Sequence, residues 1–194
     1  ALVSMLNSLE GFGLSELEHN SPEYVHLLAE SMRRAYADRA RYLADPDLVD
    51  VPVHALTAKA RADSLRATID RDRATPSDLA DAVPQWPEGP ETTHYSVVDS
   101  RGMAVSVTYT LEQGYGSGIV VPGAGFLLNN EMGDFNAAPG MTTESGLIGT
   151  EPNLARPEQR MLSSMTPSIV ARDGRLVAVV GSPGGRTIIN TVLQ

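Results

Sequence analysis

Two adjacent threonines, Thr92 and Thr93, stand where a loop rich in proline and glycine meets a strand pattern, in the stretch GPETTHYSVVD. A threonine hydroxyl is a weak nucleophile and needs a base within hydrogen-bonding distance. His94 lies on the same strand face as Thr92 but roughly 6 to 7 Å away at the rise of a strand, too far for direct proton transfer. The α-amino group of the threonine, with a pKa of about 8, becomes such a base if the chain is cut before it.

Hairpin register separates the two threonines. A three-residue loop at 100–102, with Gly102 in a left-handed position, makes Asp99 the partner of Met103 and places Thr92 opposite Thr110. The face that carries Thr92 is then rich in hydroxyl groups, whereas the face that carries Thr93 is apolar. We expect the apolar face to lie against a core, and a shift of one residue would destroy this sorting.

Three further motifs have side chains or backbone groups suited to binding. The stretch GSPGG (181–185) follows an apolar strand, so its N–H groups can approach a ligand, although a tight strand-to-helix turn explains the same pattern. It lacks the Lys-Ser/Thr of a phosphate loop, which argues against nucleotide binding. The stretch NNEMGDF contains Glu131 and Asp134, either a binding pair or a solvated acidic loop, and LSSM contains Ser163 and Ser164, which also fit a polar turn.

The elements that position these residues are predicted to be helices in the first part of the chain and strands in the second. Residues 1–9 are predicted to form a helix with Leu2, Leu6 and Leu9 on one face, ending near Gly11. A longer helix begins at the Ser21 cap and buries apolar residues at helical spacing before it ends at Asp45-Pro46 (Val25, Leu28, Ala29, Met32, Ala35, Tyr36).

Two more helices, about 57–70 and 76–82, precede a loop at 83–91. Period-2 segments then predict strands at 93–99, 103–110, 126–130, 168–172 and 175–181, with a hairpin turn RDGR and a helix after GSPGG. Helices first and an antiparallel sheet second predict an α+β fold in layers.

The composition of the chain argues against several classes of binding partner. The 194 residues have a formal net charge of −9, a pI of about 4.8 and no Lys/Arg cluster, which argues against nucleic acid and anionic membranes as partners. No apolar run approaches the roughly 18 residues of a membrane span, and the lack of cysteine excludes disulfides and thiolate metal sites. Both ends read as interrupted segments, so we expect a piece of a longer protein.

Several motifs together resemble the gamma-glutamyltranspeptidase family in order and approximate spacing: TTHYSVVDSRGMAVSVTYT, GSG, LLNNEMGDF, RMLSSMTPSIV and GSPGGRTIINTVLQ. The resemblance covers nearly the whole chain and is strongest from Thr92 onward. It implies an N-terminal-nucleophile hydrolase with a four-layer αββα sandwich, here in part. It further implies self-cleavage between Glu91 and Thr92, with 1–91 ending the large subunit in a helical part and linker loop and 92–194 beginning the small catalytic subunit.

The resemblance also implies roles for individual residues. Thr92 would be the nucleophile of cleavage and of acyl transfer, and Thr110 the hydroxyl that orients it. The oxyanion hole and the contacts to the donor's charged groups would come from a larger set (Gly184 and Gly185; Glu131 and Asp134 for the ammonium; Ser163 and Ser164 for the carboxylate). The implied substrates are γ-glutamyl amides, with an amino acid, a peptide or water as acceptor.

One position departs from the family pattern. Glu112 stands where transpeptidases of the family usually have Asn, and an anion beside the donor's α-carboxylate would repel it. This departure keeps open a glutaryl- or cephalosporin-type acylase and a poly-γ-glutamate-processing relative. An unprocessed, inactive fragment or binding homologue is the alternative of another class. Neither a metal nor an organic cofactor is implied; the implied partners are the rest of both subunits and, as a possibility, further copies of the chain.

Overall fold

The computed structural model describes residues 1–76, 91–136 and 151–194, and these form two compact units. The first unit spans Ala1–Gln85 and Asn136–Leu162, and the second spans Trp86–Phe135 and Ser163–Gln194. Helices in the first unit and antiparallel strands in the second confirm the predicted α+β class. Nearly all of the helix predicted at 76–82 and of the loop at 83–91 lies outside the described residues. The units divide the chain by compactness, so the predicted cleavage pieces 1–91 and 92–194 stay a prediction.

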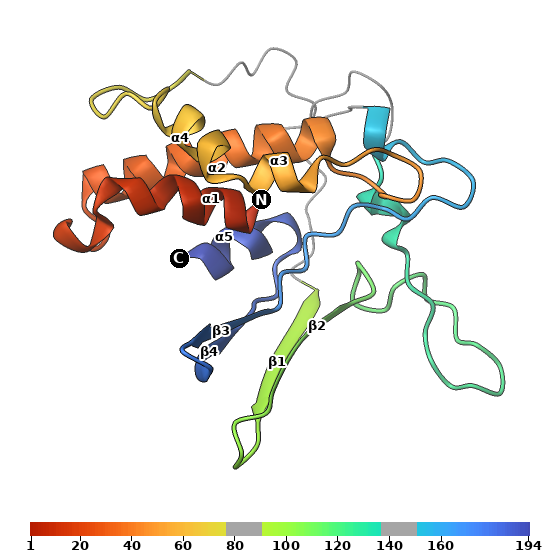
Figure 1. The fold of residues 1–194 in the computed structure, drawn as a ribbon. Helices are drawn as coiled ribbons and strands as arrows, with labels where there is room; N and C mark the ends of the chain where they lie inside the picture. Colours follow the sequence, from red (N-terminus) through yellow and green to blue (C-terminus); the bar gives the residue numbers. More distant parts are fainter. Residues whose placement is uncertain (77–90, 137–150) are drawn as a thin grey trace. The chain divides into compact units, whose positions relative to one another are not determined.

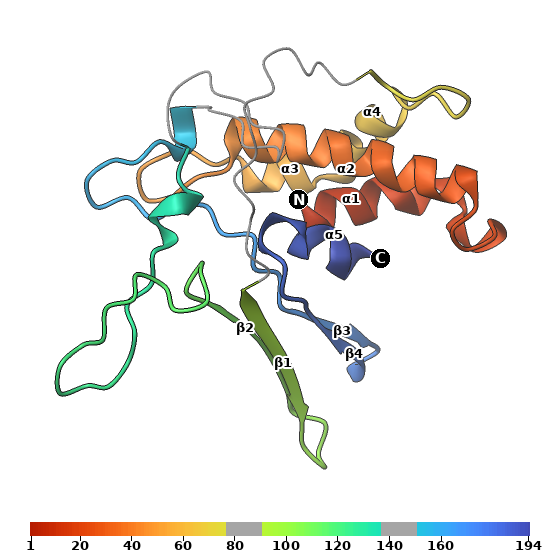
Figure 2. The same cartoon turned by 180° about the vertical axis from the view of Figure 1, so that it is seen from behind.

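Four α-helices build the first unit: α1 (Leu2–Leu9), α2 (Pro22–Tyr42), α3 (Val53–Thr57) and α4 (Lys59–Arg66). Figures 1 and 2 show α1 lying along α2, with α3 and α4 beside it. Short 3-10 turns follow α1 (Glu10–Phe12 and Leu14–Glu16), and another lies at Glu151–Asn153. The helix predicted at 57–70 is therefore two helices, because Ala58 between them is extended, with φ −67° and ψ 141°.

The buried face of α1 is only partly the predicted one, since Leu9 is buried but Leu6 is not. Met5 and Leu9 are buried, together with Ser4 and Ser8, whereas Leu6 is 50% exposed. Residues four apart on a helix share a face, and the pair that the surrounding helices cover is Met5 and Leu9. The helix does end at Leu9, but the chain turns at Gly13, which has a positive φ of 61°, rather than at Gly11.

The predicted start of α2 is confirmed. The Ser21 hydroxyl accepts a hydrogen bond from the Tyr24 N–H at 3.3 Å, and Pro22 occupies the first turn. The buried face is only partly the predicted one: Leu28 and Ala35 are buried, but Val25 is exposed, and α2 ends at Tyr42 instead of Asp45. Charged residues complete the buried face because they find partners there, which an apolar pattern does not show.

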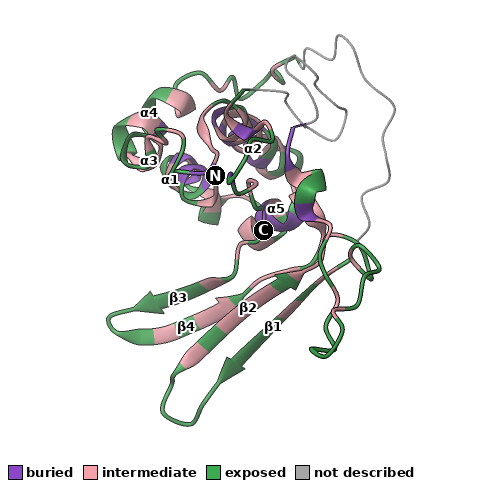
Figure 3. Ribbon diagram, turned by 90° about the vertical axis from the view of Figure 1, so that its right-hand side faces the viewer, coloured by how far each residue is buried: buried purple, intermediate pink, exposed green. Residues whose placement is uncertain are grey.

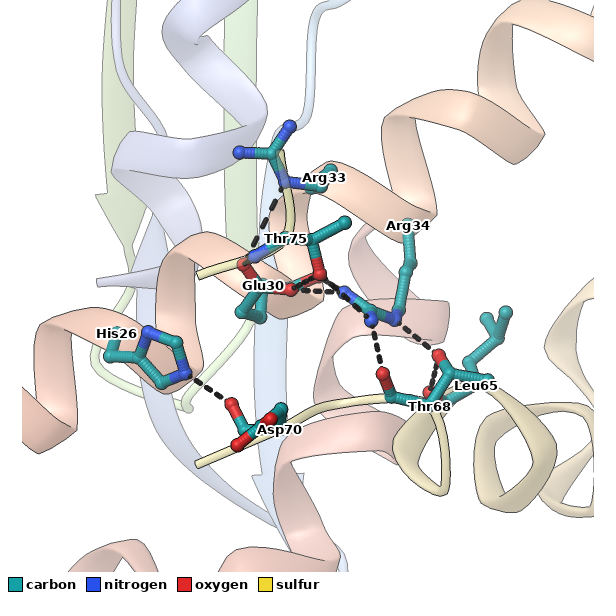
Figure 4. A network of polar contacts seen from close by, with 8 residues as sticks. All are labelled: His26, Glu30, Arg33, Arg34, Leu65, Thr68, Asp70 and Thr75. Carbon is teal, nitrogen blue, oxygen red and sulfur yellow. Dashed lines mark hydrogen bonds and ion pairs between the residues drawn. The ribbon is translucent and has the colours of Figure 1, made fainter. Parts of the chain in front are cut away.

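Glu30 is the centre of these buried partners (Figure 4). Its carboxylate accepts hydrogen bonds from the Thr75 N–H at 2.9 Å, the Thr75 hydroxyl at 2.6 Å and the Arg34 guanidinium at 2.5 Å. Although burial acts to raise the pKa of Glu30, the bonds from Thr75 and Arg34 lower it to about 2. Arg34 also donates to the hydroxyl and carbonyl of Thr68, both at 2.7 Å. The network thus holds the segment after α4 onto α2.

A second polar contact ties distant segments of the first unit together. The buried carboxylate of Asp45, after α2, accepts bonds from the Arg160 N–H at 2.8 Å and from its guanidinium at 2.5 Å. The hydrogen bonds from Arg160 lower the pKa of Asp45 well below its usual range. Asp38 on α2 likewise binds Arg61 on α4, at 2.7 Å. Charged pairs as well as apolar contacts therefore join these elements.

The second unit contains two antiparallel hairpins and a short helix. The hairpins are β1 (Thr92–Val98) with β2 (Ala104–Thr110), and β3 (Ser168–Arg172) with β4 (Arg175–Val180). Short 3-10 turns at Glu131–Asp134 and Gly185–Thr187 and helix α5 (Ile188–Leu193) complete it. The strand predicted at 126–130 is absent: Leu127 makes only an isolated bridge with Val120. Residues 126–128 lie beside 119–121, since the Val121 N–H donates to the Phe126 carbonyl and the Leu128 N–H to the Ile119 carbonyl, both at 2.9 Å, but only one bridge forms. The glycines at 116, 118, 123 and 125, before and between these segments, have positive φ.

Both hairpin turns are as predicted. Gly102 has a φ of 86° and its N–H donates to the Asp99 carbonyl at 3.0 Å, while the Asp99 N–H donates to the Met103 carbonyl. In the other hairpin Asp173 and Gly174 have φ of 52° and 74° between the paired Arg172 and Arg175. Two consecutive left-handed residues suit a two-residue hairpin loop.

The expected burial of the apolar hairpin face is wrong for these residues. Tyr95, Val97, Val105 and Tyr109 are 52%, 54%, 47% and 58% exposed. Figure 3 shows β1 mainly green and β2 with green bands between pink ones. The covered face is the one that carries hydroxyl groups, because it hydrogen-bonds to β4.

Within the described ranges no helix is long and apolar enough to cross a membrane.

Candidate active site

The predicted pairing register of the β1–β2 hairpin is confirmed. Thr92 pairs with Thr110, His94 with Thr108 and Ser96 with Ser106, so these side chains share one face of the hairpin. Thr93 pairs with Tyr109 on the other face. The two threonines point to opposite faces as expected, but Thr92 is half-buried whereas Thr93 is exposed, so the face of Thr93 is not the covered one.

The face that carries Thr92 is fixed by hydrogen bonds. The His94 ring lies 2.9 Å from the Thr108 hydroxyl through Nδ1 and 3.1 Å from the Ser96 hydroxyl through Nε2. The Ser106 hydroxyl donates to the Val180 carbonyl at 3.2 Å, at the end of β4. His94 therefore takes part in holding this face together, a role distinct from that of a base for Thr92.

The His94 ring also lies against the glycine-rich segment. A Cβ placed on Gly181 would overlap the ring atoms, so only a glycine lets the ring come this close. Gly181 directly follows β4 and opens the stretch GSPGG. The contact joins the strand of Thr92 to the segment that holds Gly184 and Gly185, and sequence reasoning missed it because it depends on the packing of two hairpins.

Gly184 and Gly185 form the sharp turn before α5. Their φ values of 128° and 53° lie where side chains are disfavoured, which explains glycine at both positions. The Gly184 carbonyl accepts from the N–H of Thr187 at 3.1 Å and from its hydroxyl at 2.7 Å. This geometry accounts for a tight turn, and the oxyanion role of the two N–H groups stays a prediction.

The loop after β2 has three consecutive N–H groups that donate to side-chain oxygens. The Glu112 N–H donates to Thr110 Oγ1 at 2.9 Å, the Gln113 N–H to Asn130 Oδ1 at 3.2 Å and the Gly114 N–H to Glu91 Oε2 at 2.5 Å. Glu112 itself has a φ of 73°, unusual for a residue with a side chain. Because each N–H has a different acceptor, the loop is held to Thr110, Asn130 and Glu91 at the same time.

A group of carboxylates lies beside this loop. Glu131 is 7% exposed, and its Oε1 has no hydrogen-bond partner within the described residues. Burial raises the pKa of Glu131 to about 7, and the charges of Asp134 and Glu112 act in the same direction, against a hydrogen bond from Thr110. The Glu112 carboxylate lies over Gly133, where a Cβ would overlap it. The structure therefore brings Thr110, Glu112, Glu131 and Asp134 together, a grouping that the sequence analysis did not predict.

Ser163 and Ser164 precede β3 in the stretch LSSM. The Ser163 hydroxyl accepts from the Met165 N–H at 3.1 Å, while Ser164 is buried and its carbonyl accepts from the Thr166 hydroxyl. The role of the serines at a substrate carboxylate stays a prediction. In the described ranges no group of three or more His, Asp and Glu side chains has the arrangement of a metal site.

The arrangement suits acyl transfer. A threonine at the start of a strand lies opposite a second hydroxyl, near a loop of N–H donors and a buried carboxyl that a cation would stabilise. Hairpin register alone placed Thr110 opposite Thr92, whereas the binding role of Glu131 was implied by the family resemblance. Sequence reasoning missed Asn130, Gly114 and the side chain of Glu91 as partners in the loop, and no motif marks them.

Comparison with known proteins agrees with this chemistry. The sequence profile described as "Gamma-glutamyltranspeptidase" matches residues 1–194. The chain is 48% identical over 194 residues to the "Glutathione hydrolase proenzyme" of Escherichia coli (strain K12), covering 100% of the chain and 33% of that protein. It is 36% identical over 193 residues to the "Acylase ACY 1 proenzyme" of Pseudomonas sp. (strain SE83), covering 100% of the chain and 32% of that protein.

A solved structure shares the fold. The cephalosporin acylase from Bacillus halodurans superposes with a TM-score of 0.74 at 23% identity, covering 100% of the chain and 32% of that structure. The chain thus spans about a third of the length of the curated relatives named above. A profile match over the whole chain and this degree of identity show the family: the chain belongs to the gamma-glutamyltranspeptidase family.

Proposed function

We propose that the protein is a γ-glutamyl acyltransferase or hydrolase that is activated by cleavage between Glu91 and Thr92. The single observation that carries the proposal is the position of Thr92, the first residue of β1 and the partner of Thr110. Cleavage at this bond gives Thr92 a free α-amino group, which is the base that no other side chain of its strand supplies.

The proposed activation is an internal acyl transfer. The Thr92 hydroxyl oxygen attacks the Glu91 carbonyl carbon, the C–N bond breaks and the nitrogen of Thr92 takes the hydroxyl proton. Water then hydrolyses the ester, leaving a new carboxylate on Glu91 and a free hydroxyl on Thr92. In this proposal 1–91 ends the large subunit and 92–194 begins the small one, within a four-layer αββα sandwich to which the rest of both subunits contributes.

Turnover repeats the chemistry on a γ-glutamyl amide. The Thr92 hydroxyl attacks the γ-carbonyl while the α-amino group takes its proton and passes it to the leaving amine. Water, an amino acid or a peptide then opens the threonyl ester. Gly184 and Gly185 would donate N–H groups to the oxyanion, each contributing about 3 kcal/mol to transition-state stabilisation. Thr110 would orient the attacking hydroxyl.

Recognition of the donor would use both of its charged groups. Glu131 and Asp134 would bind the α-ammonium, which is supported by the buried Glu131 Oε1 that has no partner within the described residues. Ser163 and Ser164 would meet the α-carboxylate. A site with buried groups that need a charged partner rejects amides that lack the ammonium.

A second candidate is an acylase for glutaryl or related side chains. Its support is Glu112, whose carboxylate lies over Gly133 beside Glu131. An anion there disfavours the donor carboxylate that γ-glutamyl and glutaryl groups share, so it favours a related acyl group without that carboxylate. A γ-glutamyl-anilide assay run beside a glutaryl-amide assay separates the two candidates. Turnover of the glutaryl substrate alone would exclude the transpeptidase function.

Mass spectrometry of Thr92→Ala tests the activation step. We expect the wild type to show cleavage between Glu91 and Thr92 and Thr92→Ala to remain intact at that bond. Thr93→Ala is the matched control, because Thr93 is adjacent but points to the exposed opposite face, and it should cleave as the wild type does. An intact wild type, or cleavage of Thr92→Ala at this bond, contradicts the proposal and favours an inactive binding homologue or another mechanism.

A further inference from the structure

The Glu91 side chain makes a contact that the proposed chemistry does not use. Its Oε2 accepts a hydrogen bond from the Gly114 N–H at 2.5 Å, and a Cβ on Gly114 would lie 3.4 Å from the same carboxylate. We propose that Glu91 is a positioning residue for self-cleavage, holding the acyl side of the Glu91–Thr92 bond against the loop after β2. This inference rests on the proposed function.

Glu91 lies at a point where the sheet no longer holds the chain. Thr92 and Thr110 are the last pair of the β1–β2 ladder, so Glu91 has no ladder partner to orient its carbonyl. An attack by the Thr92 hydroxyl requires that carbonyl in one particular direction, and orientation of this kind contributes strongly to the rate of internal reactions. The hydrogen bond from the Gly114 N–H to the Glu91 side chain therefore restrains the residue whose carbonyl must be oriented for the attack.

The loop that receives Glu91 is itself held in place. Its consecutive N–H groups bind Thr110 Oγ1, Asn130 Oδ1 and Glu91 Oε2, and Glu112 adopts its left-handed conformation there. Thr110 is the partner of Thr92 and also the first acceptor of this loop. The same short loop therefore contacts the residue opposite the nucleophile and the residue that carries the attacked carbonyl.

A carboxylate is suited to this position. A hydrogen bond from an N–H to an ionised acceptor is shorter and stronger than one between neutral groups. Glutamine would keep an acceptor without the charge, and alanine would remove it. The three side chains form a graded series in which the rate of self-cleavage should fall while the fold is kept, because Glu91 is exposed.

The test follows self-cleavage of the full-length protein in Glu91→Gln and Glu91→Ala. We expect Glu91→Ala to slow cleavage about tenfold, which corresponds to about 1.4 kcal/mol, and Glu91→Gln to slow it about threefold. Gln113→Ala is the control in the same loop: Gln113 takes part through its backbone N–H and carbonyl, and its side chain is exposed, so cleavage should be unchanged.

A second readout separates positioning from a general defect. After cleavage Glu91 is no longer attached to Thr92, so kcat and KM per cleaved molecule on a γ-glutamyl-anilide should be unchanged in both variants. Loss of kcat together with the cleavage rate would point to a structural role and overturn the inference. Glu91→Ala that cleaves at the wild-type rate overturns it while leaving the proposed function intact. A wild type that does not cleave contradicts both the role of Glu91 and the proposed function.

Discussion

Thr92 and Thr110 lie directly opposite one another as the last pair of the β1–β2 ladder. Their side chains share a face, whereas Thr93 and Tyr109 occupy the other face one step along the hairpin. The Thr110 hydroxyl accepts a hydrogen bond from the Glu112 N–H. Its hydrogen bond with Glu131 acts to lower the pKa of that carboxyl. The hydroxyl therefore connects the position of the proposed nucleophile to the loop and to the carboxyl beside it.

Replacement of Thr110 tests this connection. Thr110→Val keeps the shape of the side chain but leaves the Glu112 N–H without its acceptor and removes the hydroxyl opposite Thr92. We expect γ-glutamyl-anilide turnover to fall on the order of tenfold to a hundredfold, because a hydrogen bond in the transition state is lost. Thr110→Ser restores the hydroxyl and should recover most of the kcat.

Thr93→Val is the control for this experiment. It makes the same isosteric change at a neighbouring position on the exposed face, and its kcat should match that of the wild type. Equal losses in Thr110→Val and Thr93→Val would show that the hydroxyl at 110 has no special part in the reaction.

The raised pKa of Glu131 predicts how donor use depends on pH. Burial raises this pKa to about 7, so Glu131 is protonated below pH 7 and becomes an anion above it. An anion attracts the donor's ammonium, and kcat/KM for a γ-glutamyl-anilide should therefore rise as the pH rises through about 7. The measurement is a pH profile of kcat/KM from pH 5 to pH 9.

Glu131→Gln isolates this effect from the titration of the Thr92 amine. The variant should have a higher KM and lack the rise near pH 7, while any rise near pH 8 from the amine remains. Without donor, the linkage has the opposite sign: the folded-state pKa exceeds 4.5, so ionisation of Glu131 lowers the free energy of unfolding as the pH rises from about 4.5 to 7. An unchanged profile in Glu131→Gln would assign the titration near pH 7 to another group.

The Glu30 network predicts a stability difference between two ion pairs. Glu30→Gln removes the charge that Arg34 and Thr75 bind in a buried position, and we expect the free energy of unfolding to fall by about 3 kcal/mol. Glu23→Gln breaks the exposed pair with Arg71 and should cost less than about 1 kcal/mol. Urea denaturation followed by circular dichroism of the helices measures both.

The same network predicts sensitivity to acid. The folded-state pKa of Glu30 is lowered from 4.5 to about 2, so its contribution to stability is present above pH 4.5 and is lost as the pH falls towards 2. Glu30→Gln should remove part of this dependence. A wild type and a variant whose urea midpoints decline in parallel over that range would contradict the role of Glu30.

The contact between His94 and Gly181 predicts a non-additive pair of substitutions. Gly181→Ala adds a Cβ where the ring lies, and we expect it to destabilise the fold by about 1 to 3 kcal/mol and to reduce self-cleavage. In His94→Ala/Gly181→Ala the space is free, so the double variant should be more stable than the sum of the single changes indicates. Additive losses would show that the ring and the glycine do not interact.

The register of β1 and β2 and the turn at Gly102 could be read from local patterns. A three-residue loop and the alternation of small polar with apolar residues leave one pairing, so Thr92 opposite Thr110 was predicted and found. The cap of α2 at Ser21 was predicted for the same reason, since its chemistry involves residues three positions apart. The prediction of a strand at 126–130 is wrong because only one bridge joins this segment to 119–121, a pairing that depends on how the chain between them turns.

Sequence by itself determined which residue types stand near one another along the chain: the threonine at the start of β1, the glycines after β4 and the acidic pair of NNEMGDF. Tertiary structure alone decided which groups meet across the chain, including Glu30 with Thr75, His94 with Gly181 and Glu91 with Gly114. Local patterns follow from steric limits and periodicity within a few residues. Burial of a charge or the approach of a ring to a glycine depends on segments far apart in the chain, and on the partners that make such burial stable.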